Sequence, residues 1–236
     1  MEELKLNPDL KVSKLEHDDP NIIVYVIDDF LLNPETVTEY AENTAYFGPV
    51  GSDRTAYPGI RDRLPRPYER ALVKLIERVF DNPDVTISRC MLSLTTLEPA
   101  ELSSTQKLPH IDALGNDQFA SVHYLSKQDR GGTSIYRYKP RNLVRITADQ
   151  QDVVREMIER VKENVADHSG YLVGDTSLFK REVCIDAKYN RIVMYPGNLL
   201  HCANLDSPGS YLNDIQQGRL SVASFFQMER NENISN

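Results

Sequence analysis

Alternating and helical patterns of apolar residues divide the chain into an N-terminal part with two helices and a longer part rich in strands. The β-branched run Asn21–Phe30 predicts the first strand. Asn33 as N-cap and Pro34 as the first helical residue predict a helix after it. A second helix is predicted from Pro67, with one apolar stripe. This stripe consists of Leu72, Leu75, Ile76 and Val79.

From about residue 85 the apolar residues occur in short alternating runs, which predict strands. The predicted strands are 86–97, 118–125, 133–138, 179–185, 191–195 and 219–227. A capping box over Thr147–Gln150 opens a further helix, whose stripe from Val153 to Val165 is interpreted as core packing. Neither a repeat nor a linker divides the chain. We therefore expect a single domain over residues 1–236, with an N-terminal strand and helices in 20–80 and core strands in about 85–227.

Two stretches, 44–66 and 205–218, show no regular pattern and are long for loops within a compact domain. Such loops tend to be functional or mobile, so we expect these two to form a lid over a substrate. The first contains Arg54, Arg61 and Arg63. We expect these arginines to be solvated rather than to contact the substrate.

Composition excludes several classes of protein. The net charge is −8, from 27 basic and 35 acidic residues, with no basic run, which disfavours binding to nucleic acid or an anionic membrane. No apolar stretch approaches the roughly 20 residues that span a bilayer, and the N-terminus lacks a signal-peptide pattern. Three cysteines without CxxC spacing indicate reduced thiols, and hence a cytoplasmic protein. The oligomeric state is left open.

Candidate chemistry centres on His110 and Asp112, which are two positions apart. On an extended strand such residues project to the same face, where they can supply two ligands to one cation. His201 follows a strand and a Pro-Gly turn and is the best third ligand. Two histidines and one carboxylate leave positions on ferrous iron open for oxygen and a cosubstrate. Taken alone, however, His110 and Asp112 are more often a surface pair.

Two of the remaining histidines, His17 and His168, lie in polar segments, and we expect them to be solvated. His123 is expected to be a packed or surface residue, because it points to the opposite face of its strand from Tyr124.

The strand 219–227 begins with a guanidinium and a hydroxyl on one face, those of Arg219 and Ser221. The other face carries Leu220, Val222, Ser224 and Phe226 and suits packing against helices. A buried arginine without a partner leaves its charge desolvated at a cost of several kcal/mol. Since a planar guanidinium matches a carboxylate bidentately, a dicarboxylic cosubstrate with its other end on the metal would supply the partner. Asp206 or Asp214 could be an internal partner instead.

Together these residues resemble the iron- and 2-oxoglutarate-dependent dioxygenases, most closely their prolyl-hydroxylase-like branch. The matching stretches follow the family's order over roughly residues 22–227. They are Val24–Leu31 before a helix started by proline, His110-Ile-Asp112, Val122–Ser126 with Gly131-Gly132-Thr133, Arg191–His201, and Arg219-Leu-Ser221. The resemblance implies a mainly β fold with flanking helices, a double-stranded β-helix or jelly roll of two facing sheets. The site would lie in the open mouth between the sheets.

The resemblance also implies a set of ligands for Fe(II), 2-oxoglutarate and O2. The implied metal-binding and catalytic residues are His110, Asp112 and His201, and the implied cosubstrate anchors are Arg219 and Ser221. By the resemblance, Tyr124 aligns with a tyrosine whose hydroxyl contacts the distal carboxylate of the cosubstrate. Ser93 or Thr95, on the strand before His110, is expected near its proximal end.

The implied activity is hydroxylation of an unactivated C–H bond of a small molecule, an amino acid or a peptidyl side chain. Asp112 is retained, whereas halogenating relatives carry a small residue at this position. The same core could instead catalyse desaturation, cyclisation or demethylation, since the outcome depends on where the substrate C–H lies. A non-catalytic jelly-roll binding module is the alternative outside enzymes. A metal triad together with an anchor argues against it, because such a module needs neither.

Overall fold

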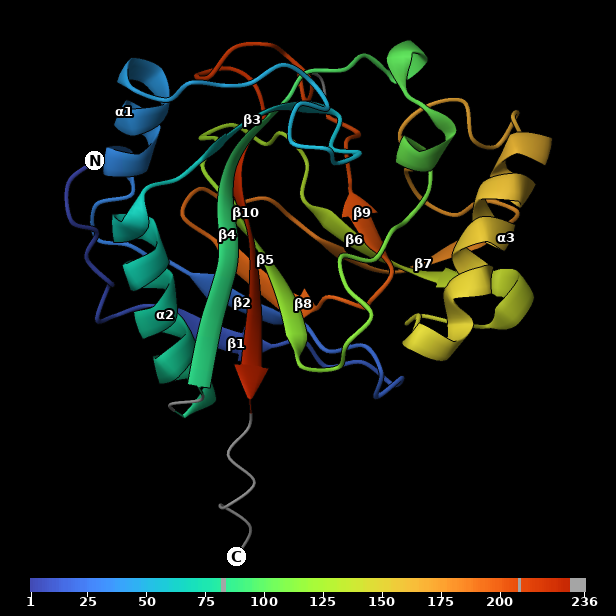
Figure 1. Cartoon of the computed structure of the whole chain (residues 1–236), viewed down its shortest axis with the longest axis horizontal. Helices are drawn as coiled ribbons and strands as arrows, with labels where there is room; N and C mark the ends of the chain where they lie inside the picture. Colours follow the sequence, from blue (N-terminus) through green and yellow to red (C-terminus); the bar gives the residue numbers. More distant parts are fainter. Residues whose placement is uncertain (82–83, 208, 230–236) are drawn as a thin grey trace, which may run out of the picture.

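Two antiparallel sheets face each other in the computed structural model, which describes residues 1–81, 84–207 and 209–229 (Figure 1). Within these ranges, the larger sheet has seven strands in the order β1-β2-β8-β5-β10-β4-β3, and the smaller has three in the order β7-β6-β9. The strands are β1 (Lys11–Lys14), β2 (Tyr25–Asp28), β3 (Gly59–Arg63), β4 (Asp84–Thr95), β5 (Gln118–Tyr124), β6 (Thr133–Tyr138), β7 (Phe179–Ile185), β8 (Ile192–Pro196), β9 (His201–Ala203) and β10 (Leu220–Glu229). The fold is mainly β with flanking helices, and the predicted jelly roll is confirmed.

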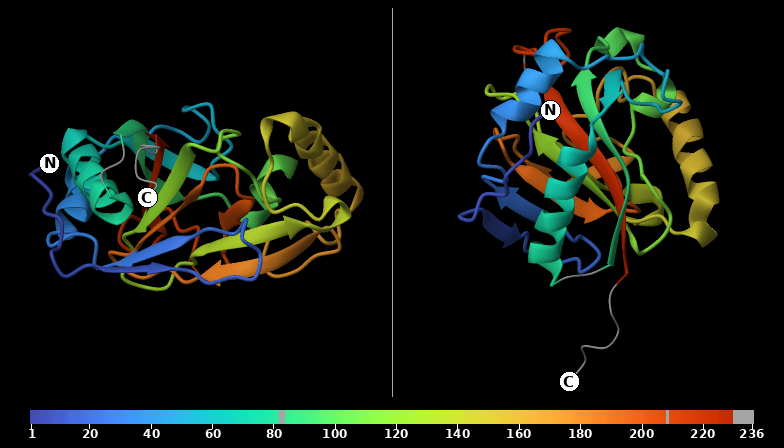
Figure 2. Two further views of the ribbon diagram at one scale, coloured as in Figure 1. Left: turned by 90° about the horizontal axis from the view of Figure 1, so that it is seen from below. Right: turned by 60° about the vertical axis from the view of Figure 1, so that its left-hand side comes forward.

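Helices cover both sides of this sandwich (Figures 1 and 2). Helices α1 (Glu35–Asn43) and α2 (Arg66–Phe80) pack on the outer face of the larger sheet, and α3 (Gln151–Glu163) packs with the smaller one. Short 3-10 helices lie in the connections: η1 (Pro99–Glu101), η2 (Ser104–Gln106), η3 (Lys139–Arg141) and η4 (Ala148–Gln150). In the part of the chain that the structure describes, no helix is long and apolar enough to cross a membrane.

Strand β10 shows how the alternation of residues builds the core. Leu220, Val222 and Phe226 enter the apolar cluster that also contains the buried face of α2. Ser221 and Ala223, on the opposite face, line a cavity between the sheets. Because β10 pairs with β4 on one side and with β5 on the other, it holds the middle of the cavity floor in place. The prediction that one face of this strand packs against helices and the other faces the site is confirmed.

Three local predictions are wrong, each for a physical reason. Pro34 rather than Asn33 caps α1, because the Asn33 side chain already accepts the backbone N–H of Lys5 at 2.9 Å. Val165 lies beyond the end of α3 and is 63% exposed, so the stripe ends before it. His168 is buried rather than solvated, since its ring packs edge-on against that of Phe179.

The stretch 44–66 is not a loop throughout. Its last part forms β3, which pairs with β4 at the edge of the larger sheet. With five residues, β3 is too short for its alternation to stand out in the sequence. The pairing places Arg61 opposite Ser93, and so on the same face of the sheet as the cavity floor.

Candidate functional site

Backbone hydrogen bonds bring the predicted metal ligands together from distant parts of the chain. His110 and His201 exchange two of them, from the N–H of each to the carbonyl oxygen of the other, at 2.9 and 3.0 Å. The N–H of Asp112 donates to the carbonyl oxygen of Gly197 at 2.7 Å. His110 therefore continues the smaller sheet beside β9, and Asp112 lies against the turn that precedes β9.

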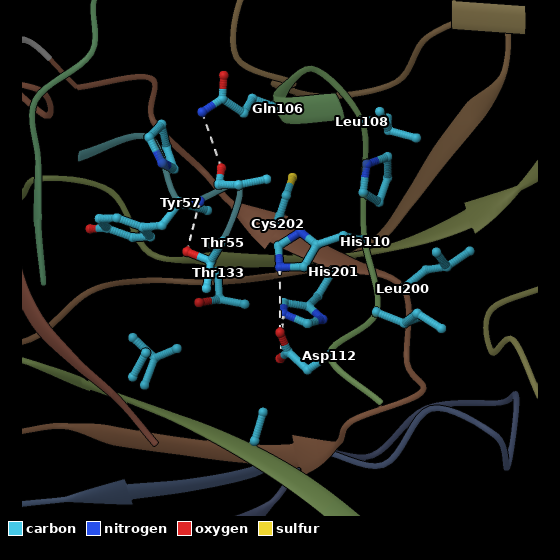
Figure 3. Close-up of a pocket in the computed structure, with 18 of the residues that line it drawn as sticks. Thr55, Tyr57, Gln106, Leu108, His110, Asp112, Thr133, Leu200, His201 and Cys202 are labelled. Carbon is cyan, nitrogen blue, oxygen red and sulfur yellow. Dashed lines mark hydrogen bonds and ion pairs between the residues drawn. The ribbon is translucent and has the colours of Figure 1, made fainter. Parts of the chain in front are cut away.

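The three side chains turn toward one another (Figure 3). One ligand atom from each of His110, Asp112 and His201 lies within 4.8 Å of the other two. The Asp112 carboxylate is 3.2 Å from His201 Nε2 and 3.7 Å from His110 Nε2. Ligands that each lie about 2.0–2.2 Å from one metal ion, at right angles, are roughly 3 Å apart. The donor atoms and their spacing thus fit a divalent transition metal that is bound by three protein ligands on one face and has its other coordination positions open.

The tautomer of His201 is set by a backbone carbonyl. Its Nδ1 donates to the carbonyl oxygen of Leu199 at 2.8 Å, which leaves Nε2 as the ligand atom. Metal-binding histidines are usually oriented in this way by a hydrogen bond at the other ring nitrogen. His201 is buried, whereas the side chain of His110 is 53% exposed and that of Asp112 is 15% exposed.

The charges of these residues are coupled. Burial acts to lower the pKa of His201, but the neighbouring Asp112 carboxylate outweighs it and raises that pKa above its ordinary value. Burial acts to raise the pKa of Asp112, and His201 outweighs it in turn, so this pKa is lowered. The His110 side chain is half exposed, but desolvation of its ring by the surrounding protein, together with the charge of His201, lowers its pKa to about 4. The two shifts favour a protonated His201 beside an ionised Asp112, and a metal bound at His201 Nε2 would compete with that proton.

The triad opens into a cavity of about 470 Å³ between the sheets. A volume of this size is typical of small-molecule sites. Most of the cavity wall is apolar, and its charged lining within the described residues consists of Arg61, Arg89, Arg219, Asp112 and the two histidines. The cavity can therefore hold an organic molecule beside a metal ion and has an excess of positive charge.

Arg219 is a buried cation, 4% exposed, held by main-chain atoms. Its Nε donates to the carbonyl oxygen of Gly131 at 3.0 Å, and one terminal nitrogen, Nη2, donates to that of Gly132 at 3.3 Å. Within the described part of the chain Arg219 forms no ion pair, and the other terminal nitrogen, Nη1, has no hydrogen-bond partner. Neither of the proposed internal partners, Asp206 and Asp214, binds it. Arg219 lines the cavity and keeps donor capacity for a carboxylate.

The two glycines make this arrangement possible. Gly131 has φ of 82°, and a Cβ there would clash with the carbonyl oxygen of Asn204. A Cβ on Gly132 would clash with the carbonyl oxygen of Ile185. The close packing of the turn between β5 and β6 against its neighbours therefore requires glycine, and it directs two carbonyl groups at the guanidinium.

The other predicted anchors take different places. Ser221 is buried and lines the cavity, and so does Thr95. The Tyr124 hydroxyl is hydrogen-bonded to Thr133 Oγ1 at 2.7 Å, and Thr133, not Tyr124, reaches the cavity wall. Ser93 lies behind the wall as well, where its Oγ donates to the Met91 carbonyl oxygen and accepts from Arg61 Nε, each at 3.0 Å. The structure does not bring Tyr124 or Ser93 to the cavity.

Some residues of the cavity were not predicted from the sequence. Arg61 was expected to be solvated, but it lines the cavity, bound to Asp53 at 3.2 Å and lying over the ring of Tyr57. Arg89 and Tyr195 also line it. Arg89 is two positions from Met91 and four from Ser93 on β4, so it shares a strand face with Ser93. The prediction that Ser93 faces the site could therefore have identified Arg89 as well.

Only one of the two loops predicted to form a lid lines the cavity, and helix α3 contributes to the wall as well. Of the first loop, Thr55–Pro58 line the cavity, and Gln106 on η2 donates to the Ala56 carbonyl oxygen at 3.1 Å. In the second loop, none of the described residues, 205–207 and 209–218, lines it. Three apolar residues of α3 do contribute to the wall: Val154, Met157 and Ile158. The α3 stripe is therefore not core packing alone.

Comparisons with known proteins give a family without an assigned function. The model of a family described as "Family of unknown function (DUF6445)" matches residues 7–226. No curated protein matches the sequence.

Several solved structures resemble the fold. One is SnoN from nogalamycin biosynthesis, described as a non-heme alpha ketoglutarate dependent epimerase, with 11% identity and a TM-score of 0.48 over 86% of this chain and 77% of SnoN. HygX from Streptomyces hygroscopicus, with nickel and 2-oxoglutarate bound, has 13% identity and a TM-score of 0.48 over 86% of this chain and 82% of HygX. SnoK, a carbocyclase from nogalamycin biosynthesis, has 8% identity and a TM-score of 0.44 over 87% of this chain and 79% of SnoK. Likeness at this level does not transfer an activity, and the prolyl-hydroxylase-like branch stays a prediction.

Proposed function

This chain belongs to the DUF6445 family, and we propose that it is an Fe(II)- and 2-oxoglutarate-dependent oxygenase that hydroxylates a C–H bond of a small organic substrate or a peptidyl side chain. One observation carries the proposal. Two imidazoles and a carboxylate converge in the same cavity as a buried arginine that has no carboxylate partner among the described residues. The first set suits ferrous iron with open positions, and the second suits the far end of a dicarboxylic cosubstrate.

The residues fit both groups. His110, Asp112 and His201 would hold the metal through Nε2 of each histidine and a carboxylate oxygen. Arg219 and Ser221 would bind the distal carboxylate, while Tyr124 would support them from behind, through its hydrogen bond to Thr133 and through its ring, whose centroid lies 5.8 Å from the Arg219 guanidinium. When bound, iron with 2-oxoglutarate and O2 supplies the oxidising power for C–H cleavage, with succinate and CO2 as coproducts.

The contribution of the chain itself is orientation, charge and exclusion of water. Metal binding at His201 Nε2 would compete with the proton that the neighbouring Asp112 carboxylate favours there. The carbonyl groups of Gly131 and Gly132 fix the guanidinium of Arg219 before the cosubstrate arrives, which lowers the ordering cost of binding. The apolar wall keeps water from the reacting C–H bond. Whether the outcome is hydroxylation, desaturation, cyclisation or demethylation follows from where the substrate presents that bond.

The proposal extends to the whole chain as one domain, and to the cytoplasm as its location. Cys90, Cys184 and Cys202 are all free thiols, which suits a reducing compartment.

The test is an anaerobic titration of the purified chain with Fe(II), followed by 2-oxoglutarate. We expect stoichiometric iron uptake and a weak visible absorption band when 2-oxoglutarate is added, and we expect His201→Ala to show neither. Iron uptake without the band would leave a metal protein that does not use 2-oxoglutarate. Absence of both in the wild type would favour a non-catalytic binding module and end the proposal.

A further inference from the structure

Arg89 is a cation on the cavity wall that the proposed reaction does not use. It lies on β4 opposite Phe225 of β10, and its guanidinium carbon is 4.7 Å from the centroid of the Phe225 ring. Both residues line the cavity. Among the residues that the structure describes, no ion pair or side-chain hydrogen bond involves Arg89. Its donors are therefore open to a ligand in the cavity.

The other two arginines of the cavity are already matched. Arg61 is paired with Asp53, so this pair adds no net charge. Under the proposed function, on which the following inference rests, Arg219 receives the distal carboxylate of 2-oxoglutarate. The charge of Asp112 and that of the second cosubstrate carboxylate balance the divalent metal. Arg89 is then the one uncompensated charge among the described residues of the cavity.

Arg89 and Arg219 start from well-separated positions on the larger sheet. Phe225, the strand partner of Arg89, is six residues along β10 from Arg219, roughly 20 Å on an extended chain. Under the proposed function, both carboxylates of 2-oxoglutarate are already bound, one by Arg219 and the other by the metal. The group that binds Arg89 must belong to a different molecule.

The strand pairing of the larger sheet gives a row of four residues that runs across the cavity floor, with Arg89 at one end and the metal ligands near the other. Tyr195, Ala120, Phe225 and Arg89 are successive partners across β8, β5, β10 and β4. Three strand spacings separate the ends of the row, roughly 14 Å. The ring of Tyr195 is 4.5 Å from that of His201, so the triad lies at the Tyr195 end. The floor between the two ends is apolar.

We propose that the substrate is an organic anion, with a carboxylate or phosphate group that binds Arg89 and an apolar body that lies over Ala120 and Phe225 toward the metal ligands. The guanidinium stacked on Phe225 is held in place by the ring and keeps its N–H groups for the anion. The length of the row selects molecules in which the oxidised carbon is separated from the acidic group by an apolar chain or ring. Arg89 thus determines substrate specificity.

The test measures binding of simple probes by calorimetry, with the full-length chain in excess 2-oxoglutarate so that Arg219 is occupied. The anionic probes are octanoate and octyl phosphate, and the neutral probe is octanol. The variants are Arg89→Gln, Arg89→Lys and a matched control, Arg63→Gln. Arg63 is on the adjacent strand β3, its side chain is 64% exposed and bound to Glu69, and it does not line the cavity.

We expect at least one anionic probe to bind the wild type and Arg63→Gln equally, and Arg89→Gln at least about tenfold more weakly, with Arg89→Lys in between. The preferred probe identifies the acidic group as carboxylate or phosphate. Octanol should bind more weakly than the anions, and equally to all four proteins. Equal anion binding by wild type and Arg89→Gln, octanol binding as tight as that of the anions, or no anion binding by the wild type would each overturn the proposal.

The iron and 2-oxoglutarate absorption band, measured on the wild type without these probes, separates the two proposals. If the band forms and anion binding does not depend on Arg89, the oxygenase proposal stands and the substrate class is wrong. If the band does not form, the oxygenase proposal fails whatever the probes do.

Discussion

Two buried histidines on different sides of the larger sheet have opposite environments. On the outer face, His123 is hydrogen-bonded at Nδ1 to the Tyr68 hydroxyl at 3.1 Å and at Nε2 to Asn190 Oδ1 at 3.3 Å. On the cavity side, His201 is held at Nδ1 by a backbone carbonyl and presents Nε2 to a carboxylate. Burial lowers the pKa of His123 to about 3, whereas Asp112 raises that of His201. What distinguishes a candidate ligand from a core histidine is therefore the partner of its second nitrogen, not burial.

The comparison predicts that substitutions on the cavity side change ligand binding and that those on the outer face change stability. The largest effect is expected for Asp112→Ala. Loss of outer-shell partners alone costs about 10–100-fold in metal affinity, so loss of a ligand should cost more than about 100-fold. Titration with iron measures the affinity of the variant, and thermal unfolding checks that the variant is folded. Wild-type iron affinity in the variant would remove Asp112 from the triad.

Arg219→Ala should weaken 2-oxoglutarate binding by about thirtyfold or more, since loss of one partner of a buried charge pair costs about 2–5 kcal/mol. Iron affinity should change only a few fold, because Arg219 does not belong to the triad. Separate titrations of metal and cosubstrate measure the two effects. Equal losses in both would indicate that Arg219 supports the fold rather than the cosubstrate.

His123 should make the protein less stable in acid. Its pKa is about 3 in the folded chain and about 6.5 when unfolded, so between these values the unfolded chain binds the additional proton. Stability from this residue is complete above about pH 6.5 and is lost as the pH falls toward 3. At about pH 5 the loss is roughly 2 kcal/mol. Urea unfolding at about pH 7 and at about pH 5 measures this effect. The free energy of unfolding should differ less between the two pH values for His123→Gln than for the wild type.

The smallest effect is expected for Tyr68→Phe, which removes the hydroxyl bonded to His123. Loss of this buried hydrogen bond should lower the free energy of unfolding by about 1 kcal/mol. Iron uptake should stay at the wild-type level, because Tyr68 lies on the helix side of the sheet. A change in iron affinity would show that the two sides of the sheet are coupled.

Local patterns account for much of what could be predicted. The i, i+2 spacing of His110 and Asp112, the Pro-Gly turn before His201, and the two faces of β10 follow from strand periodicity and turn chemistry. These signals need only neighbouring residues. They predicted all three residues of the candidate triad, whereas the jelly-roll fold was implied by the resemblance to the dioxygenases.

What could not be predicted depends on pairing between distant strands. Arg61 reaches the cavity because the short strand β3 joins the edge of the sheet. Arg89 shares a strand face with Ser93, but that this face borders a cavity depends on the strands that pair beside it. Tyr124 lies behind Thr133 because its hydroxyl is taken by that residue, a contact between two strands that periodicity does not specify.

The two backbone hydrogen bonds between His110 and His201 have a consequence for the metal-free protein. They form an isolated bridge that joins the two histidines beside β9, so separating the imidazoles would mean breaking these backbone hydrogen bonds. The chain should therefore fold without metal and keep the ligand geometry ready for it. Chelation should leave the fold intact, and the amide protons of these two histidines should exchange slowly with solvent even in the apo state.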